Sequence, residues 1–194
     1  NVVSATEQTF ALLLGLLRKV PAADASMKRG EWDRKSFQGN ELFGKTLGVI
    51  GFGKIGRKVA ARARAFEMEV VVYDPFFDPG HARDFGVEPL AIDALVERAD
   101  IVTFHTPLTT ETRNILSAER IARMKRGALV VNCGRGGVLD EAALLAALES
   151  GQIGGAALDV FEEEPTPRLD LVRHPRVVAA PHMGAQTAEA QERI

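Results

Sequence analysis

The stretch that decides the fold is LGVIGFGKIG, from Leu47 to Gly56. An apolar, β-branched run leads directly into the pattern G-x-G-x-x-G, formed by Gly51, Gly53 and Gly56. A strand, this glycine loop and a helix, predicted over residues 55–66, together are typical of a dinucleotide-binding βαβ unit. The first glycine allows the tight turn, the second lets a pyrophosphate approach the backbone, and the third lets the helix pack closely on the strand.

An acidic residue follows at the expected distance. The next predicted strand ends in Asp74, which lies 74 − 56 = 18 residues after Gly56, close to the usual spacing of about 20. A carboxylate at this place accepts hydrogen bonds from both adenosine ribose hydroxyls and repels a 2′-phosphate. The spacing therefore predicts NAD as the cofactor, in preference to NADP.

Outside this unit, short β-branched runs alternate with helical patterns, which is typical of a parallel sheet with helices on both faces. The sequence thus predicts an α/β fold with a doubly wound parallel sheet of the Rossmann type, whose ligands bind at the carboxyl ends of the strands. The predicted strands are 47–51, 70–74, 87–88, 101–105, 129–133, 155–160 and 177–180, and the predicted helices that follow them are 55–66, 92–99, 118–124, 141–150 and 185–194.

Two further helices are predicted before the sheet. Ser4 and Glu7 form a capping-box pattern at the start of the first one, and Pro21 suits the first turn of the second one, which Gly30 ends. The apolar run FALLLGLL over residues 10–17 makes the first helix apolar on nearly every side. Such a helix needs a cover, which is either its own domain or a partner subunit.

Composition excludes several classes of function. The chain has 194 residues, 46% of them hydrophobic, and a formal net charge of −2, so we expect neither nucleic-acid nor membrane binding. Its longest apolar run is shorter than the roughly 20 residues that cross a bilayer. A single cysteine, Cys133, cannot form an internal disulfide, which suits a cytoplasmic protein. No HExxH or CxxC pattern is present, so no metal site is expected.

Three strand ends carry side chains suited to oxidation of an α-hydroxy acid. Arg135 lies in a glycine-rich turn, residues 162–164 are all glutamate, and His182 follows the last predicted strand. A guanidinium can hold a substrate carboxylate by two hydrogen bonds, an imidazole can take the hydroxyl proton, and a carboxylate can orient the imidazole. The residues alone leave alternatives open, because His105 also ends a strand and any of the three glutamates could be the partner.

Long segments of the chain resemble the D-isomer-specific 2-hydroxyacid dehydrogenases, in their nucleotide-binding domain. The resemblance extends over nearly the whole chain and implies that Arg135, Glu164 and His182 are the catalytic residues. It is carried by SMKRGEWDRKSFQGNELFGKTLGVIGFGKIGRKVA (26–60), VVNCGRGGVLDEAALLAALESGQIGGAALDVFEEEP (130–165) and APHMGAQTAEAQ (180–191).

The resemblance also implies the cofactor contacts. Beyond the three glycines of the loop, these fall on Lys54, Ile55, Asp74, Thr106, Pro107, Cys133, Gly134, Arg135, Asp159, His182, Gly184 and Ala185. Cys133 is then a wall residue rather than a nucleophile, His105 belongs to the cofactor wall, and Glu162 and Glu163 have no role. Gly134 and Gln186 depart from the family pattern, which commonly has alanine and serine at these places.

Members of this family place part of a substrate domain before the nucleotide-binding domain and return to it afterwards. Here the chain begins at Asn1 rather than Met, and only 50 residues precede Gly51. We therefore expect residues 1–194 to be the NAD-binding domain, with 1–46 as a helical lead-in and homodimer arm and with the substrate-binding domain missing. Such a chain should bind NAD and turn over substrate poorly.

The family implies NAD-dependent oxidation of a D-2-hydroxy acid. The GAQTAEAQ segment after His182 favours 3-phosphoglycerate as the substrate, with glycerate, glyoxylate or lactate partners as alternatives. Arg34 and Lys35, which follow Trp32, are a candidate contact to a substrate phosphate, although a solvated basic loop explains them as well. A different class with the same fold, the C-terminal-binding-protein corepressors, uses NAD to control assembly and binds short peptides.

Overall fold

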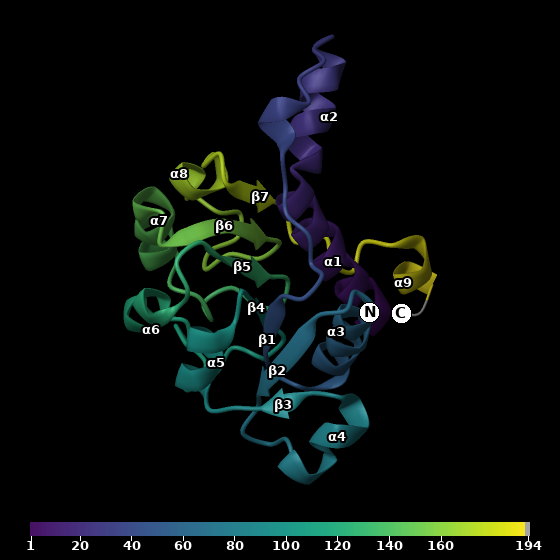
Figure 1. The fold of residues 1–194 in the computed structure, drawn as a ribbon, viewed down its shortest axis with the longest axis vertical. Coiled ribbons are helices and arrows are strands. Elements are labelled where there is room, and N and C mark those ends of the chain that lie inside the picture. The colour runs from purple at the N-terminus through teal and green to yellow at the C-terminus, as the bar shows by residue number, and fades with distance from the viewer. Residues whose placement is uncertain (193–194) are drawn as a thin grey trace.

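The computed structural model, which describes residues 1–192, contains one parallel sheet (Figure 1). Its spatial order is β3-β2-β1-β4-β5-β6-β7, and every neighbouring pair is parallel. This confirms the predicted doubly wound α/β fold, and each predicted strand is present within one or two residues of its expected ends. The strands are β1 (Thr46–Ile50), β2 (Glu69–Tyr73), β3 (Glu88–Pro89), β4 (Ile101–Phe104), β5 (Ala128–Asn132), β6 (Ile153–Leu158) and β7 (Val177–Ala179).

Helices cover both faces of this sheet (Figure 1). One buried apolar cluster joins the strands to α5, α6 and α7, and a second cluster joins them to α1 and α3. Two short helices, α4 and α8, were not predicted. The helices are α1 (Val2–Arg18), α2 (Val20–Lys28), α3 (Lys54–Ala65), α4 (Ala82–Phe85), α5 (Ile92–Arg98), α6 (Ala118–Arg123), α7 (Glu141–Ser150), α8 (Leu169–Val172) and α9 (Ala188–Glu192). The helix predicted over 185–194 is thus shorter at its start, and its last two residues lie outside the described range.

The predicted cap of the first helix is wrong. Helix α1 begins at Val2, and Ser4 lies inside it, 4% exposed, with its hydroxyl 2.9 Å from the Thr187 hydroxyl. Local capping chemistry therefore gives way to a contact with a residue at the other end of the chain. The apolar side of α1 lies against its own domain, because Phe10 and Leu13 are buried in the cluster shared with α3. Of the two predicted covers, its own domain is thus the one observed for this part of α1.

Helix α2 projects away from the body of the molecule (Figure 1). A left-handed residue, Lys19, separates it from α1, and Pro21 lies in its first turn as predicted. Most of its residues and most of the segment after it are exposed, including Met27 at 53% and Trp32 at 79%. The domain itself leaves these apolar side chains uncovered.

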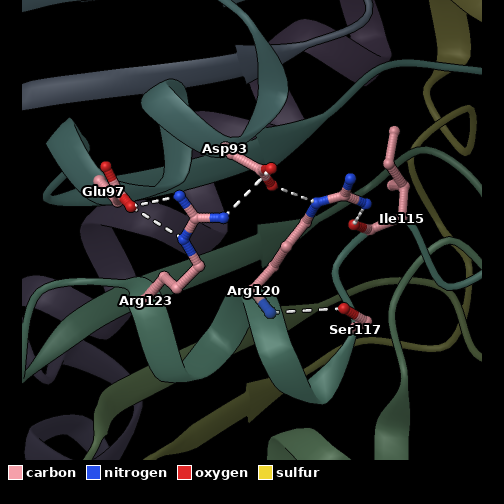
Figure 2. Close-up of polar contacts among 6 residues, drawn as sticks. All are labelled: Asp93, Glu97, Ile115, Ser117, Arg120 and Arg123. Carbon is pink, nitrogen blue, oxygen red and sulfur yellow. Dashed lines mark hydrogen bonds and ion pairs between the residues drawn. The ribbon is translucent and has the colours of Figure 1, made fainter.

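A network of ion pairs links α5 to α6 (Figure 2). The Arg120 guanidinium donates to Asp93 at 2.9 Å and to the Ile115 carbonyl oxygen at 2.8 Å. Arg123 contacts Asp93 at 3.1 Å and also binds Glu97. The hydrogen bond from Arg120, and to a smaller extent the charge of Arg123, lower the pKa of the Asp93 carboxyl, although desolvation opposes them. The side chains are partly exposed, so each pair contributes little to stability.

Candidate active site

The glycine loop connects β1 to α3, and the surrounding backbone explains two of its three glycines. Gly51 has φ +92°, and a Cβ on it would lie 2.5 Å from the His105 carbonyl oxygen. A Cβ on Gly56 would lie 2.1 Å from the Gly51 carbonyl oxygen. Both positions therefore exclude a side chain on steric grounds, as the predicted tight turn and close helix packing require.

Gly53 is different, because a Cβ there would meet no atom within 4 Å. The residue is exposed and is the N-cap of α3, where no side chain makes a capping hydrogen bond. The first amides of this 12-residue helix are thus available to an anion, and the helix dipole favours negative charge there. Open space above a glycine at a helix N-terminus fits the pyrophosphate of a dinucleotide.

Asp74 follows β2 directly and lies beside the glycine loop. Its carboxylate accepts the Phe52 amide at 2.7 Å and the Phe76 amide at 2.8 Å. The side chain predicted to recognise the ribose therefore also holds the backbone of the loop that would hold the phosphates. Spacing in the sequence indicated the first of these roles but not the second.

The remaining predicted cofactor residues lie at the same edge of the sheet, after the carboxyl ends of the strands. They are Lys54 and Ile55 at the start of α3, Thr106 and Pro107 after β4, Cys133 and Gly134 after β5, Asp159 after β6, and Gly184 and Ala185 after β7.

His105 also lies at this edge, directly after β4. Its Nε2 is 3.0 Å from the Thr103 hydroxyl, and burial lowers the pKa of His105 to about 4. The ring is therefore neutral near pH 7 and accepts protons poorly. Of the two histidines that the sequence left in competition, His105 is therefore poorly suited to accept a proton.

His182 and Glu164 form a hydrogen-bonded pair. The His182 Nδ1 atom is 2.6 Å from Glu164 Oε2, and Glu164 Oε1 accepts the Phe161 amide at 3.1 Å. Partial burial raises the pKa of the Glu164 carboxyl, but the hydrogen bonds from His182 and Phe161, with the charge of Arg135, outweigh it and lower the pKa overall. Of the three consecutive glutamates, the one before the proline is therefore the partner of the imidazole.

Asp159 holds the loop that carries His182. Its buried carboxylate accepts the Met183 amide at 2.9 Å and the Gly184 amide at 2.8 Å, and its carbonyl oxygen accepts the His182 amide at 2.8 Å. His182 itself has φ +51°, a conformation that such external contacts must stabilise. The family resemblance predicted Asp159 as a cofactor contact. In the structure, both of its carboxylate oxygens accept main-chain amides of the loop that carries His182.

The turn that carries Arg135 is shaped by Asn132, which sequence reasoning missed. Asn132 is 2% exposed, accepts the Gly134 amide at 3.1 Å and donates to the Arg135 carbonyl oxygen at 2.9 Å. The Arg135 side chain is exposed. A polar residue at the end of an apolar strand was the only signal of this role.

Cys133, between Asn132 and this turn, is a poor nucleophile. Burial and the charge of Asp159 raise the pKa of its thiol to about 12, against a smaller opposing effect of a hydrogen bond from Thr9. The thiol stays protonated near neutral pH, which suits a wall residue.

A pocket of about 600 Å³ lies on one side of the His182–Glu164 pair. Both side chains line it together with apolar residues such as Phe161 and Val172, whereas Arg135 and the glycine loop do not.

Within residues 1–192, no group of three or more His, Cys, Asp or Glu side chains could hold a metal ion. None of the helices in the same range has the length and apolarity to cross a bilayer.

Known proteins resemble this chain over most or all of its length. The family model described as "D-isomer specific 2-hydroxyacid dehydrogenase, NAD binding domain" matches residues 10–184. The D-3-phosphoglycerate dehydrogenase of Bacillus subtilis is 52% identical over 191 residues, 98% of this chain and 36% of that protein. The human protein of the same name is 49% identical over 193 residues, again 36% of its length. The chain thus spans about a third of these relatives.

Solved structures extend this likeness to the fold. A glyoxylate reductase from Paecilomyes thermophila superposes with a TM-score of 0.92 at 36% identity, covering 98% of this chain and 58% of the other. A D-lactate dehydrogenase from Aquifex aeolicus, complexed with NAD and lactic acid, superposes with a TM-score of 0.91 at 32% identity, covering 100% and 63%. In each case the match leaves over a third of the other chain unaccounted for.

Proposed function

Because the chain belongs to the D-isomer-specific 2-hydroxyacid dehydrogenases, as their NAD-binding domain, we propose that it serves an enzyme that oxidises D-3-phosphoglycerate to 3-phosphohydroxypyruvate, at the entry to serine biosynthesis. Relatives named D-3-phosphoglycerate dehydrogenase match nearly the whole chain at 49 to 52% identity. The observation that carries the dehydrogenase chemistry is the His182–Glu164 pair, with Nδ1 and Oε2 2.6 Å apart, at the same sheet edge as the glycine loop, and the identity to these relatives carries the choice of substrate.

When bound at the glycine loop and Asp74, NAD would supply the acceptor for the hydride that leaves the substrate carbon bearing the hydroxyl. His182 takes the hydroxyl proton at Nε2, because its Nδ1 faces Glu164. Glu164 fixes the orientation of the ring by the hydrogen bond at Nδ1. Arg135, exposed in its glycine-rich turn, holds the substrate carboxylate by a two-point contact. Catalysis then depends on three side chains from three different strand ends.

We further propose that these residues supply one domain of a longer enzyme, with residues 1–46 as helical lead-in and homodimer arm and a substrate domain outside this chain. The length match of 36% to the curated relatives and the exposed Trp32 support this arrangement. The enzyme would be cytoplasmic. The 194-residue chain alone should bind NAD, and near-full turnover by it would contradict the proposal.

A second candidate function is the interconversion of another 2-hydroxy acid and its 2-oxo acid, with glyoxylate, hydroxypyruvate or lactate as the substrate. The solved structures named glyoxylate reductase and D-lactate dehydrogenase, with TM-scores of 0.92 and 0.91, favour it. Steady-state kinetics of the full-length enzyme, with each acid compared by kcat/KM, separates the two. A phosphoglycerate value below that of the other acids would overturn the narrower proposal.

The cofactor assignment is tested by titrating NAD and NADP into the chain. We expect the wild type to prefer NAD by about 10-fold or more, since the Asp74 carboxylate repels a 2′-phosphate. Asp74→Ala should weaken NAD binding and reduce the preference. Asp78→Ala is a matched control, because Asp78 lies on the same loop but binds the Gly80 amide at 2.8 Å. Equal wild-type affinities for the two cofactors would contradict the role of Asp74.

A further inference from the structure

Two glutamates fasten the segment that carries Glu164 to helix α7. Glu141 is the first residue of α7 and is 4% exposed, and its Oε1 accepts the Glu162 amide at 2.6 Å. In return, Glu162 Oε1 accepts the Glu141 amide at 3.2 Å. Each residue thus bonds the main chain of the other, and the pair joins segments 21 residues apart in the sequence.

A buried carboxylate is costly unless its oxygens find donors. Burial raises the pKa of the Glu141 carboxyl, while the Glu162 amide and the more distant Arg168 charge lower it in part. The first turn of a helix also favours a negative charge, and Asp140 already caps α7 by accepting the Ala143 amide at 2.9 Å. Since the cap is filled by Asp140, Glu141 is left to hold the neighbouring segment.

That neighbouring segment, residues 161–164, includes Glu164 of the proposed catalytic pair and also packs against the turn that carries Arg135. Phe161 donates its amide to Glu164 at 3.1 Å, and Glu164 contacts His182. Gly136, next to Arg135, lies so close that a Cβ on it would be 1.7 Å from the Phe161 carbonyl oxygen. A shift of the segment would therefore move the glutamate relative to the imidazole and disturb the turn of the arginine.

We propose that Glu141 is a positioning residue for the reaction: its carboxylate holds the Glu162 amide and so keeps Glu164 within hydrogen-bond reach of His182. This inference rests on the proposed function, because it assumes that the His182–Glu164 pair transfers the proton. Glu141 touches no reacting group and acts through the main chain of residues 161–164. Displacement of a catalytic group by about 1 Å can cost up to about 100-fold in rate.

The test uses the full-length enzyme and its kcat, KM and activity–pH profile. Glu141→Ala should lower kcat by about 10-fold or more with little change in the KM for NAD, and its pH profile should move toward that of Glu164→Gln. Glu141→Gln should retain most of the activity, because its amide oxygen can still accept the Glu162 amide. Glu163→Gln should match the wild type, since Glu163 is exposed and is not used in the hydrogen bonds of this segment within residues 1–192.

A double variant separates positioning from general damage. If Glu141 acts through Glu164, adding Glu141→Ala to Glu164→Gln should cost little more than Glu164→Gln alone. The proposal would be overturned if Glu141→Ala lowered kcat by the same factor in the wild type and in Glu164→Gln. A Glu141→Ala enzyme that is less stable but keeps its kcat and pH profile would also overturn it. Glu141→Asp, which is too short to reach the same amide, gives the same test if Glu141→Ala fails to fold.

The same series distinguishes this inference from the proposed function. Full activity of both His182→Gln and Glu164→Gln would overturn the catalytic pair, and the role of Glu141 would fall with it. Loss of activity in those two variants, together with an unaffected Glu141→Ala, would overturn the role of Glu141 alone.

Discussion

The carboxyl edge of the sheet and the α5–α6 surface both gather acidic side chains, but these bind different partners. At the carboxyl edge, Asp159 and Glu141 are buried and accept main-chain amides. On the α5–α6 surface, Asp93 and Glu97 are partly exposed and bind the guanidinium groups of Arg120 and Arg123 (Figure 2).

This difference in hydrogen-bond partner determines how firmly each region holds its main-chain conformation. A main-chain amide cannot move without moving its loop, so a buried carboxylate bonded to it fixes the loop conformation. An exposed guanidinium rotates freely and exchanges its partner for water at little cost. Geometry is thus enforced where proton transfer is proposed, whereas the helix surface needs only a favourable average charge arrangement.

Removal of Asp159 should have the largest effect on stability. In Asp159→Ala the buried Gly184 amide loses its acceptor, and so does the Met183 amide. We expect the free energy of unfolding to fall by about 3 kcal/mol, since hydrogen bonds to charged groups contribute about 1.5 to 3 kcal/mol each. Urea unfolding of the 194-residue chain, followed by circular dichroism, measures this.

Asp159→Asn is the matched comparison, because it keeps one carbonyl acceptor and the side-chain volume. Its free energy of unfolding should lie between those of the wild type and Asp159→Ala. A change below about 0.5 kcal/mol in Asp159→Ala, the range typical of surface substitutions, would break the proposed contrast between the two regions.

The buried imidazole of His105 should give the same edge a pH dependence. Burial lowers the pKa of His105 to about 4 in the folded chain, against about 6.5 when unfolded. Its contribution to stability is therefore fully present above pH 6.5 and is lost as the pH falls toward 4. We expect a loss of about 1 to 2 kcal/mol, less than the full shift implies, because His105 as a residue is only half-buried.

His105→Asn should remove this part of the pH dependence, whereas His81→Asn, at an exposed position, should leave it in place. Unfolding free energies measured at intervals between pH 4 and 7 distinguish the two variants. Identical slopes in His105→Asn and the wild type would show that His105 is not the group that titrates.

Short-range spacing predicted the parts of the fold and site that depend on neighbours in the sequence. The glycine loop and Asp74 lie within one βαβ unit, so their relation follows from the spacing alone. The choice among the three glutamates came from family resemblance, since it depends on how the loops after β6 and β7 meet. The contact of Glu164 with His182 spans 18 residues, and the spacing of residue types does not encode it.

Long-range contacts also explain what the sequence reasoning missed. The capping pattern at Ser4 failed because α1 already begins at Val2 and the Ser4 hydroxyl contacts that of Thr187, 183 positions away, in a part-buried site. Glu162 was given no role, yet it bonds to the first residue of α7. Both errors came from reading polar residues against their immediate neighbours, while in the structure their partners lie on other elements.

The smallest effects are expected on the α5–α6 surface, where two arginines offer an internal comparison. Among residues 1–192, Arg123 bonds only to side chains, whereas Arg120 also donates to the Ile115 carbonyl oxygen at 2.8 Å (Figure 2). Arg123→Ala should lower the melting temperature by no more than about 2 °C, and Arg120→Ala by somewhat more. About 1 M salt should reduce the Arg123 effect, because screening weakens exposed pairs, and should leave the Asp159→Ala loss nearly unchanged. If salt reduced both losses equally, the main-chain contacts at the sheet edge would hold no advantage over exposed ion pairs, and the distinction between the two regions would fail.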